Sequence, residues 1–275
     1  MNEKCEICGQ YGIILYKFKK DLLYNTEGKW NIIYCDNCGF AWLDPKPSVM
    51  DFEKLYENYH TQFKERKEQK IQSTKKFQYV MGKLIFHYKI QKSVIFKLIT
   101  GNSNIKKKFA GNFLSKLIRF IPYIQDFTRY FLMNIEPPSC PGLKLLDVGC
   151  GSGWFVQLMN DIGFEAYGIE PDEIAAKIAK ENTSENVKIT QGFLSDNIYE
   201  NNYFDYITLR HVIEHLGNPE DTLLICFKLL KPGGKLYIQT PNLNSLGHLA
   251  FKEYWRGLEI PRHIYIYSNY SVVYN

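Results

Sequence analysis

The sequence predicts an α/β protein with a mainly parallel sheet, and three observations lead to this fold class. In the second half of the 275-residue chain, short apolar runs alternate with stretches that have helical periodicity. Repeated strand–helix units of this kind build a parallel sheet with helices on both faces. Three glycines within five residues, from Gly149 to Gly153, separate the first apolar run from the first helical stretch. Such a turn brings backbone N–H groups close to a ligand at the carboxyl edge of the sheet.

Helix start signals support this order of elements. Asp172 precedes a helical stretch, and Asn218 is followed by Pro219, a preferred first residue of a helix. The helix after Asn218 is expected to stop at Lys231-Pro-Gly-Gly234. The strands that the apolar runs predict cover residues 145–148, 164–169, 187–190, 206–209 and 236–239.

Residues 1–60 contain two Cys-x-x-Cys pairs, each followed directly by a glycine. Two pairs supply four thiolates, the tetrahedral ligand set that favours Zn²⁺. A redox dithiol is the alternative interpretation, but it requires only one pair. Residues 13–18 and 30–34 have strand-like composition, so we predict a structural zinc ribbon. Residues 40–47 are expected to lead out of the ribbon into a short linker helix that starts at Ser48, which completes a first domain over residues 1–60. The predicted zinc ligands are Cys5, Cys8, Cys35 and Cys38.

The middle of the chain differs from the rest in charge. Residues 61–130 hold 16 Lys or Arg side chains and only 3 acids, whereas the whole chain has a net charge of +5. Apolar residues recur there at helical spacing, which predicts a basic helical insertion over residues 61–138. We favour a solvated insertion packed on the core. An amphipathic surface that contacts anionic lipid or a lipid-linked glycan is the second interpretation, and a nucleic-acid footprint is the least favoured.

Composition and the first residues indicate a cytoplasmic protein. Residues 1–10 are polar and carry two cysteines, unlike a signal peptide. No run approaches the roughly 18 to 20 uncharged apolar residues that span a bilayer. If the basic insertion contacts anionic lipid, the protein is expected to associate peripherally with the inner face of the membrane.

The glycine turn has the pattern Asp147-x-Gly149-x-Gly151-x-Gly153. It resembles the first motif of class I S-adenosylmethionine-dependent methyltransferases. A dinucleotide fingerprint, G-x-G-x-x-G, would instead need a glycine where Trp154 stands.

Three later segments extend this resemblance. The Gly-Ile-Glu-Pro sequence of residues 168–171 looks like the second motif of that family, and residues 204–216 and 229–238 resemble its fourth- and fifth-strand regions. Together with the zinc ribbon, this order resembles zinc-bearing bacterial methyltransferases found with sugar and polysaccharide tailoring enzymes. The resemblance implies a Rossmann-like methyltransferase core over residues 139–275.

The resemblance also implies an S-adenosylmethionine site at the carboxyl ends of four strands. The glycine turn would face the methionine end of the cofactor, and Glu170 would accept hydrogen bonds from the ribose hydroxyls. Structural alternatives stay open: Glu170 as a surface acid, Phe193 as a core residue, and Asp147 as a brace of the turn. The predicted cofactor-binding residues are Asp147, Gly149, Cys150, Gly151, Gly153, Glu170, Pro171, Gly192, Phe193, Leu194, Arg210 and His211.

The sulfonium methyl group is already activated, so in-line approach of the acceptor does most of the catalytic work. A base is useful in addition where the acceptor is a hydroxyl or an acidic carbon. The candidate bases are His211, His215 and His263, and each has a structural role as its alternative. His211 and His215 are expected to share one helical face. Residues 254–256 and 261–263 resemble the acceptor-side lid of the family. No Asn/Asp-Pro-Pro-aromatic motif follows the fourth strand, which argues against methylation of adenine N6.

The predicted function is methyl transfer to a small-molecule or glycan-linked acceptor, such as a sugar or a nucleotide sugar. The resembling family has seven strands, but only a short strand at residues 265–267 is predicted after Thr240. The chain is therefore expected to be C-terminally shortened, and a non-catalytic cofactor-binding protein is the alternative function. The zinc ribbon and the basic segment keep an RNA methyltransferase as a further alternative.

Overall fold

The computed structural model describes residues 3–47, 133, 135, 138–269 and 271. The chain divides into two compact units, Met1–Thr61 with Cys140–Asn275, and Gln62–Ser139. All helices and strands given below belong to the first unit. The predicted linker helix from Ser48 lies outside the described residues, and the predicted basic insertion, with its possible lipid and nucleic-acid contacts, lies almost wholly outside them.

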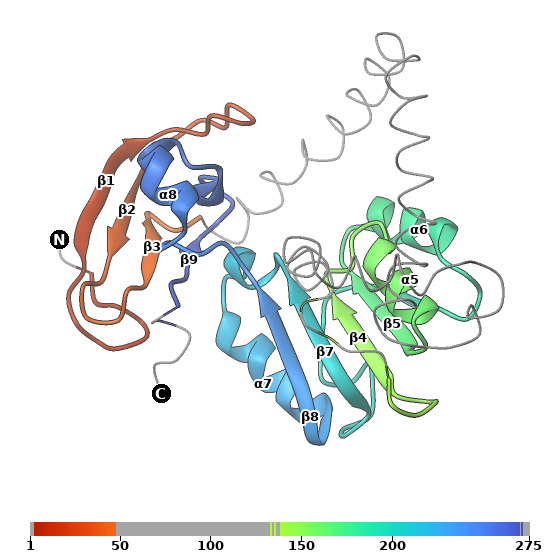
Figure 1. Ribbon diagram of the computed structural model, residues 1–275. Helices are drawn as coiled ribbons and strands as arrows, with labels where there is room; N and C mark the ends of the chain where they lie inside the picture. Colours follow the sequence, from red (N-terminus) through yellow and green to blue (C-terminus); the bar gives the residue numbers. More distant parts are fainter. Residues whose placement is uncertain (1–2, 48–132, 134, 136–137, 270, 272–275) are drawn as a thin grey trace, which may run out of the picture. The chain divides into compact units, whose positions relative to one another are not determined.

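A five-stranded sheet forms the centre of the first unit (Figure 1). Its strand order is β6-β5-β4-β7-β8, and every neighbouring pair is parallel. The predicted α/β class with a parallel sheet is thus confirmed. The strand order reverses beside β4, which places the turn that follows β4 at the usual ligand position of such sheets. The strands are β4 (Lys144–Val148), β5 (Glu165–Glu170), β6 (Lys188–Gln191), β7 (Phe204–Arg210) and β8 (Leu230–Gln239).

Three helices connect these strands: α5 (Trp154–Asp161), α6 (Glu173–Asn182) and α7 (Pro219–Leu229). The two predicted caps are present. The Asp172 carboxylate accepts a hydrogen bond of 2.6 Å from the Ala175 N–H, and the Asn218 side chain accepts one from the Asp221 N–H. Among the described residues, no helix has the length and apolar character needed to cross a membrane.

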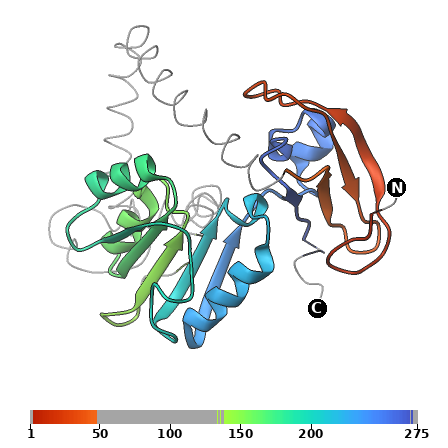
Figure 2. The ribbon, with the colours of Figure 1, turned by 180° about the vertical axis from the view of Figure 1, so that it is seen from behind.

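Packing of α7 against the sheet fixes the strands next to the glycine turn. Figure 2 shows α7 alongside β8. Cys226 and Leu229 of α7 are fully buried, and they share one apolar cluster with Leu146 of β4 and Ile207 of β7. Burying one such aliphatic side chain contributes about 1.5–3 kcal/mol. This apolar cluster therefore packs α7 against β4 and β7, the strands that lead to the glycine turn and to Arg210.

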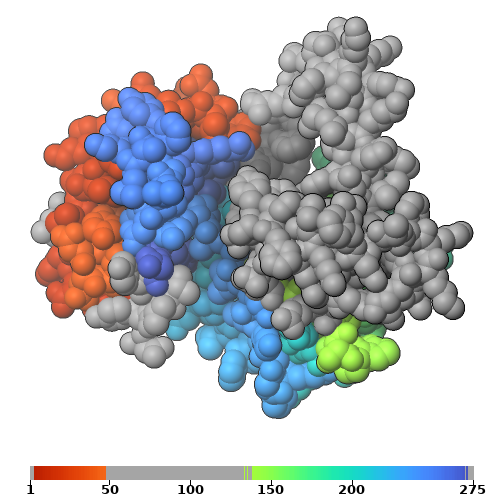
Figure 3. All heavy atoms as spheres, viewed as in Figure 1, coloured from red at the N-terminus to blue at the C-terminus, as the bar shows by residue number. Residues whose placement is uncertain are grey.

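A second, antiparallel sheet joins the N-terminal ribbon to the C-terminal part of the chain. Its strand order is β1-β2-β3-β9, with β1 at Ile13–Lys19, β2 at Trp30–Tyr34, β3 at Ala41–Asp44 and β9 at Tyr265–Ile266. The short strand predicted at 265–267 thus exists, but it pairs with β3 of the ribbon and not with the parallel sheet (Figure 1). In Figure 3 the blue C-terminal atoms lie directly against the red and orange ribbon.

The expectation that residues 40–47 leave the ribbon is wrong. Ala41, Trp42 and Leu43 form β3 and are all buried, because Trp42 faces one apolar cluster while Ala41 and Leu43 face another. A strand that is buried on both faces has no polar–apolar alternation to reveal it.

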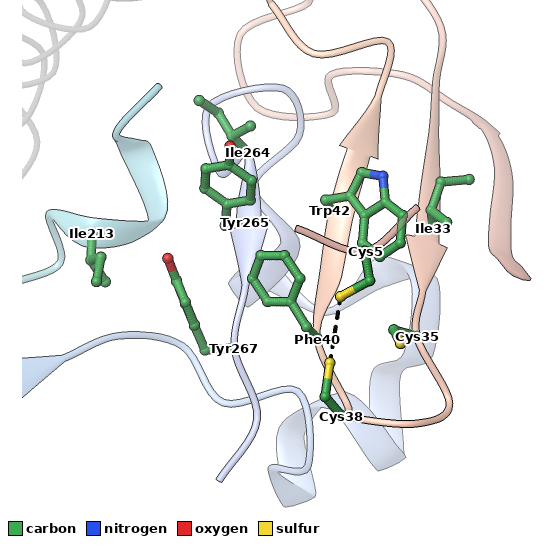
Figure 4. Packing of buried hydrophobic residues seen from close by; sticks show 10 residues of the cluster. All are labelled: Cys5, Ile33, Cys35, Cys38, Phe40, Trp42, Ile213, Ile264, Tyr265 and Tyr267. Carbon is green, nitrogen blue, oxygen red and sulfur yellow. Dashed lines mark hydrogen bonds between the residues drawn. The ribbon is translucent and has the colours of Figure 1, made fainter. Parts of the chain in front are cut away.

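An aromatic cluster connects the ribbon, β9 and the segment after β7 (Figure 4). The Phe40 ring lies 5.5 Å from the Tyr265 ring and 5.4 Å from the Tyr267 ring, centroid to centroid. Ile213, in a short 3₁₀ helix at Ile213–His215 after β7, belongs to the same cluster. The short helices before β9 are α8 (Leu246–Phe251), Lys252–Tyr254 and Arg256–Leu258.

Candidate functional site

The three glycines of the turn after β4 have different surroundings. A Cβ on Gly149 would lie 2.6 Å from the Val212 side chain, and one on Gly153 would lie 3.1 Å from the Ala179 backbone. Around the Cβ position of Gly151, no atom of the described residues lies within 4 Å. All three have positive φ, so each also has a conformational reason to be glycine. Of the three glycines, Gly151 is the one whose Cβ side is open as far as the described residues go, so a ligand can approach its backbone.

The Glu170 carboxylate lies against this turn. One of its oxygens accepts a hydrogen bond of 2.8 Å from the Gly151 N–H, and the other accepts one of 3.1 Å from the Asp172 N–H. Glu170 is the last residue of β5 and is buried, with 9% of its surface exposed. Glu170 is thus not a freely solvated surface acid. Its two backbone bonds fix the carboxylate beside Gly151.

Two other predicted residues lie beneath the turn. Asp147 is buried in β4, and its carboxylate accepts a 2.6 Å hydrogen bond from the Thr208 hydroxyl of β7. Burial raises the pKa of Asp147 to about 7, although the Thr208 bond and the Arg210 charge act in the opposite direction. Cys150 is also buried, and a Cβ on Gly168 would lie 2.8 Å from its Sγ atom. Asp147 therefore links the two central strands, and Cys150 packs between the turn and β5.

The segment after β6 lies next to Glu170. The Gly192 N–H donates a 2.9 Å hydrogen bond to the Glu170 carbonyl oxygen. Phe193 is 80% exposed, so it is not a core residue, whereas Leu194 packs on the apolar cluster beneath the sheet. Pro171 is exposed after β5. An exposed aromatic ring beside the Gly151–Glu170 contact offers a surface on which a flat ring can stack.

Arg210, the last residue of β7, lies over the start of α5. Its guanidinium carbon is 4.5 Å from the centroid of a Trp154 ring and 4.3 Å from that of Phe155. Stacking of a cation on aromatic faces contributes about 0.5–2 kcal/mol and limits side-chain motion. A fixed positive charge thus lies beside the first helical turn after Gly153.

The three candidate histidines differ in exposure. His211 has a side chain that is 51% exposed, with Nδ1 3.2 Å from a Glu214 carboxylate oxygen. His215 and His263 are largely buried, and their Nδ1 atoms contact the backbone carbonyl oxygens of Arg262 and Gly257. Burial lowers the pKa of His215 to about 4 and also lowers that of His263.

The expectation that His211 and His215 share a helical face is wrong. The 3₁₀ helix contains Ile213 to His215, whereas His211 precedes it with a left-handed φ of 55°. Glu214, which was not among the predicted site residues, lies between the histidines and is fully buried. The adjacent Glu-His pair after the fourth strand was the only sequence signal for it.

The predicted lid residues are divided between surface and core. Tyr254 is 72% exposed, but Arg262 is completely buried and pairs with Asp21 of the ribbon. Arg262 therefore contacts the ribbon, and its guanidinium is not available to an acceptor.

The four predicted zinc ligands come together in the ribbon. Figure 4 shows three of them, Cys5, Cys35 and Cys38. Their sulfur atoms all lie within 4.8 Å of one another, with Cys5 to Cys38 at 3.5 Å and Cys8 to Cys35 at 3.4 Å. Both turns have the same backbone bonds, since Gly9 N–H donates to the Cys5 carbonyl and Gly39 N–H to the Cys35 carbonyl, each at 2.8 Å.

This cysteine cluster fits a tetrahedral metal ion. Gly9 and Gly39 have φ values of 73° and 71°, so the two turns are near copies of each other. Burial raises the pKa of the Cys5 and Cys38 thiols. Burial acts in the same direction on Cys8, but hydrogen bonds from neighbouring groups lower the pKa of Cys8 to about 6. Four sulfur donors, with no position left for another ligand, are typical of a structural site.

Comparison with known proteins places the chain in a family. The family model described as a methyltransferase domain matches residues 114–272. A mitochondrial ubiquinone biosynthesis O-methyltransferase of Rattus norvegicus is 31% identical over 149 residues, which are 50% of this chain and 43% of that protein. A ubiquinone biosynthesis O-methyltransferase of Thiobacillus denitrificans is 33% identical over 112 residues, covering 39% and 48%. The chain thus spans about half the length of the curated relatives it matches.

Solved structures with a similar arrangement are more distant. The YcgJ protein of Bacillus subtilis aligns with a TM-score of 0.42 and 21% identity, over 51% of this chain and 63% of that one. A methyltransferase of Thermotoga maritima, described as a possible histamine N-methyltransferase, aligns with a TM-score of 0.41 and 20% identity, over 56% and 75%. The family model covers more than half of the sequence, and on that basis the chain belongs to the methyltransferase domain family.

Proposed function

We propose that this chain transfers the methyl group of S-adenosylmethionine to a hydroxyl group of a small-molecule acceptor, with a sugar, nucleotide sugar or glycan-linked sugar as the acceptor class. The observation that carries the proposal is the contact between Gly151 and Glu170 at the carboxyl edge of the parallel sheet. It combines an open stretch of backbone with a fixed carboxylate, at the switch point of the strand order.

The residues around this contact fit the parts of the cofactor. Each oxygen of the Glu170 carboxylate has one backbone donor and retains a lone pair that can accept a hydrogen bond from a ribose hydroxyl. The exposed Phe193 ring suits the adenine base, and the Arg210 guanidinium suits the carboxylate of the methionine part. When bound, the cofactor supplies an activated sulfonium methyl group.

Transfer to oxygen is supported by two independent points. The relatives described above are named O-methyltransferases. In addition, His211 presents a half-exposed imidazole at the end of β7, next to the strand that carries the glycine turn. Such a ring can take the proton of an acceptor hydroxyl as the methyl group is transferred. The sugar class rests on the resemblance of the zinc-ribbon arrangement to sugar-tailoring methyltransferases.

The cysteine cluster is proposed to hold one structural Zn²⁺. Cys5, Cys8, Cys35 and Cys38 would supply all four ligands, so the ion takes no part in the transfer. The aromatic cluster around Phe40 and Tyr265 lies beside these cysteines, so the metal would support the part of the chain that follows β8.

The first test is a calorimetric titration of the zinc-loaded full chain with S-adenosylhomocysteine. We expect micromolar binding that weakens at least about tenfold in Glu170→Ala, because a lost hydrogen bond to a charged group costs about 1.5–3 kcal/mol. Glu173→Ala in the first turn of α6 is the matched control, and it should bind as the wild type does. No binding by a folded, zinc-loaded chain would contradict the cofactor site.

The acceptor is tested with labelled S-adenosylmethionine and a panel of nucleotide sugars, simple phenols and total RNA. Label transferred to a sugar hydroxyl supports the proposed class. Label found only in RNA would refute that class, and cofactor binding without transfer to any acceptor would favour a non-catalytic binding protein.

A further inference from the structure

Glu214 is an acid that the fold buries completely, and among the described residues the His211 side chain lies within hydrogen-bond distance of its carboxylate. Its side chain is 0% exposed. One carboxylate oxygen lies 3.2 Å from His211 Nδ1, and the other has no hydrogen-bond partner among the described residues. The Glu214 carbonyl accepts a 2.8 Å hydrogen bond from the Ile264 N–H, which anchors the residue to the segment before β9. Burying an ionised carboxylate is costly unless the charge is paired and hydrogen-bonded, so the contact with His211 matters for Glu214.

The two neighbouring histidines cannot donate to this carboxylate while they are neutral. His215 and His263 direct Nδ1 at carbonyl oxygens, at 3.0 Å and 2.8 Å, and a carbonyl oxygen only accepts. Their Nδ1 atoms therefore carry the hydrogen, and Nε2 of each ring is an acceptor. The two rings contact each other edge to face at 4.6 Å between centroids. His211 is thus the ring that can donate a hydrogen bond to Glu214.

The hydrogen bonds around Glu214 support its ionised form. Burial opposes ionisation, but the hydrogen bonds from His211 and from the residue's own backbone act in the opposite direction, and the pKa of Glu214 lies below its usual value. Burial lowers the pKa of both His215 and His263, which keeps them neutral near pH 7. Arg262, on the segment packed against them, is engaged by Asp21 and Glu259.

His211 itself is held in an unusual backbone conformation. Its φ is 55°, although it is not a glycine, and its N–H donates a 2.8 Å hydrogen bond to the Gln239 carbonyl at the end of β8. A non-glycine residue in this region is strained, and such residues concentrate at functional sites. The conformation puts a half-exposed ring above Glu214, at the edge of the sheet where the cofactor site is proposed.

We propose that Glu214 is the positioning residue for His211: its carboxylate holds the ring with Nδ1 protonated, leaves Nε2 free to act as the base, and stabilises the imidazolium that forms. This inference rests on the proposed function. In hydrolases with a Ser-His-Asp triad, a buried carboxylate likewise orients the catalytic histidine and does not itself take the proton.

The step balances as follows. The acceptor O–H bond breaks and its proton goes to Nε2 of His211, while the oxygen forms a bond to the methyl carbon and the carbon–sulfur bond breaks. The products are the methyl ether and S-adenosylhomocysteine, and the proton on His211 passes afterwards to water. Glu214 remains ionised throughout, so its role is electrostatic and geometric.

The decisive measurement is made on the wild-type chain. Ring ¹⁵N chemical shifts of the ¹⁵N-histidine-labelled wild-type chain report which nitrogen carries the hydrogen, and His211→Asn assigns the His211 signals by their loss. We expect the neutral His211 ring to carry its hydrogen on Nδ1. An Nε2–H tautomer would overturn the proposal. This readout holds even if the chain transfers no methyl group, so failure of the proposed function and failure of this inference are distinguishable.

A double-mutant cycle tests the functional part. Glu214→Gln and His211→Asn should each lower kcat by about 10²- to 10⁴-fold with little change in KM, as expected for loss of general-base catalysis. In the double variant, Glu214→Gln should cause no further loss, because Glu214 acts only through His211. Circular dichroism and denaturant unfolding of each variant serve as the controls for folding. Equal activity of Glu214→Gln and wild type, or full additivity in the double variant, would overturn the proposal.

A metal measurement excludes the competing role for the same side chain. Donor atoms of Glu214, His215 and His263 lie within 4.8 Å of one another. We expect the purified chain to hold a single zinc ion, retained in Glu214→Gln and lost in a cysteine variant. A second ion that Glu214→Gln removes would assign Glu214 to a cation and overturn its assignment to His211.

Discussion

Arg262 and Asp21 form a fully buried, bidentate ion pair that joins the C-terminal segment to the N-terminal ribbon. Nη1 of Arg262 lies 3.0 Å from Oδ2 of Asp21, and Nη2 lies 3.0 Å from Oδ1. Both side chains are 0% exposed, and the guanidinium stacks on the Tyr24 ring at 4.1 Å. The two residues are separated by 241 positions in the sequence, so the pair connects the ribbon near the N-terminus to the segment just before β9.

We expect Arg262→Ala to destabilise the protein strongly. Removing one partner of a buried ion pair leaves the other charge unpaired in a dry environment, which typically costs about 3–5 kcal/mol. Denaturant unfolding followed by tryptophan fluorescence measures the loss. Lys228→Ala is the control, because the Lys228–Asp196 pair is exposed, and exposed pairs contribute at most about 1 kcal/mol. Equal effects of the two substitutions would show that the pair does not anchor the ribbon.

The same pair predicts a pH dependence of stability. Burial alone would raise the pKa of Asp21, but hydrogen bonds from Arg262, Thr26 and the following backbone lower it to about 2. A carboxyl group with a lowered folded-state pKa stabilises the protein above its unfolded pKa of about 4, and this stability is lost as the pH falls toward 2. We expect Asp21→Asn to be less stable than wild type at pH 7 and the difference to shrink between pH 4 and pH 2. A constant difference across that range would contradict the assignment.

The parallel sheet could be predicted from sequence because its signals are local. The apolar runs, the Asn218–Pro219 helix start and the Gly149–Gly153 turn each report on a few neighbouring residues, and the structure places all of them as expected.

The ribbon's junction with the C-terminal segment could not be predicted in this way. A short strand at β9 is expected from the sequence, but its two residues do not indicate which strand it pairs with. Its partner β3 is buried on both faces and carries no polar–apolar alternation. The environments of His215 and His263 depend on carbonyl groups of the segment at residues 257–262, far from β7 in sequence. Which histidine is exposed is a tertiary property, and residue type alone does not report it.

Removal of the metal should destabilise the ribbon together with β9. Cys38→Ser is expected to lose the bound zinc and to lower Tm, because a structural metal contributes directly to folding free energy. A loss of about 2 kcal/mol corresponds to a Tm decrease of about 4–8 °C in a chain of this size. Metal analysis and thermal unfolding measure the two effects. Cys140→Ser, at an exposed cysteine outside the cluster, should change neither, and unchanged zinc content in Cys38→Ser would refute the proposed ligand set.

Alanine substitutions at Gly151 and Gly153 should have different effects, because the first glycine is proposed to make room for the ligand and the second makes room for neighbouring protein atoms. A Cβ on Gly153 would lie 3.1 Å from the Ala179 backbone and 2.9 Å from the Thr183 side chain, so Gly153→Ala combines a crowded contact with a φ of 77°. At Gly151 the described surroundings leave room, and only the φ of 54° is unfavourable, at a cost of about 1–2 kcal/mol.

We therefore expect Gly153→Ala to lose more stability than Gly151→Ala, and Gly151→Ala to weaken S-adenosylhomocysteine binding at least about tenfold while remaining folded. Calorimetric titration and denaturant unfolding of both variants measure the two quantities. A folded Gly151→Ala chain that binds the ligand as tightly as wild type would show that the cofactor does not approach the backbone at this glycine. That result would move the proposed site away from the turn, because Gly149 and Gly153 are already in contact with protein atoms on the side where a Cβ would point.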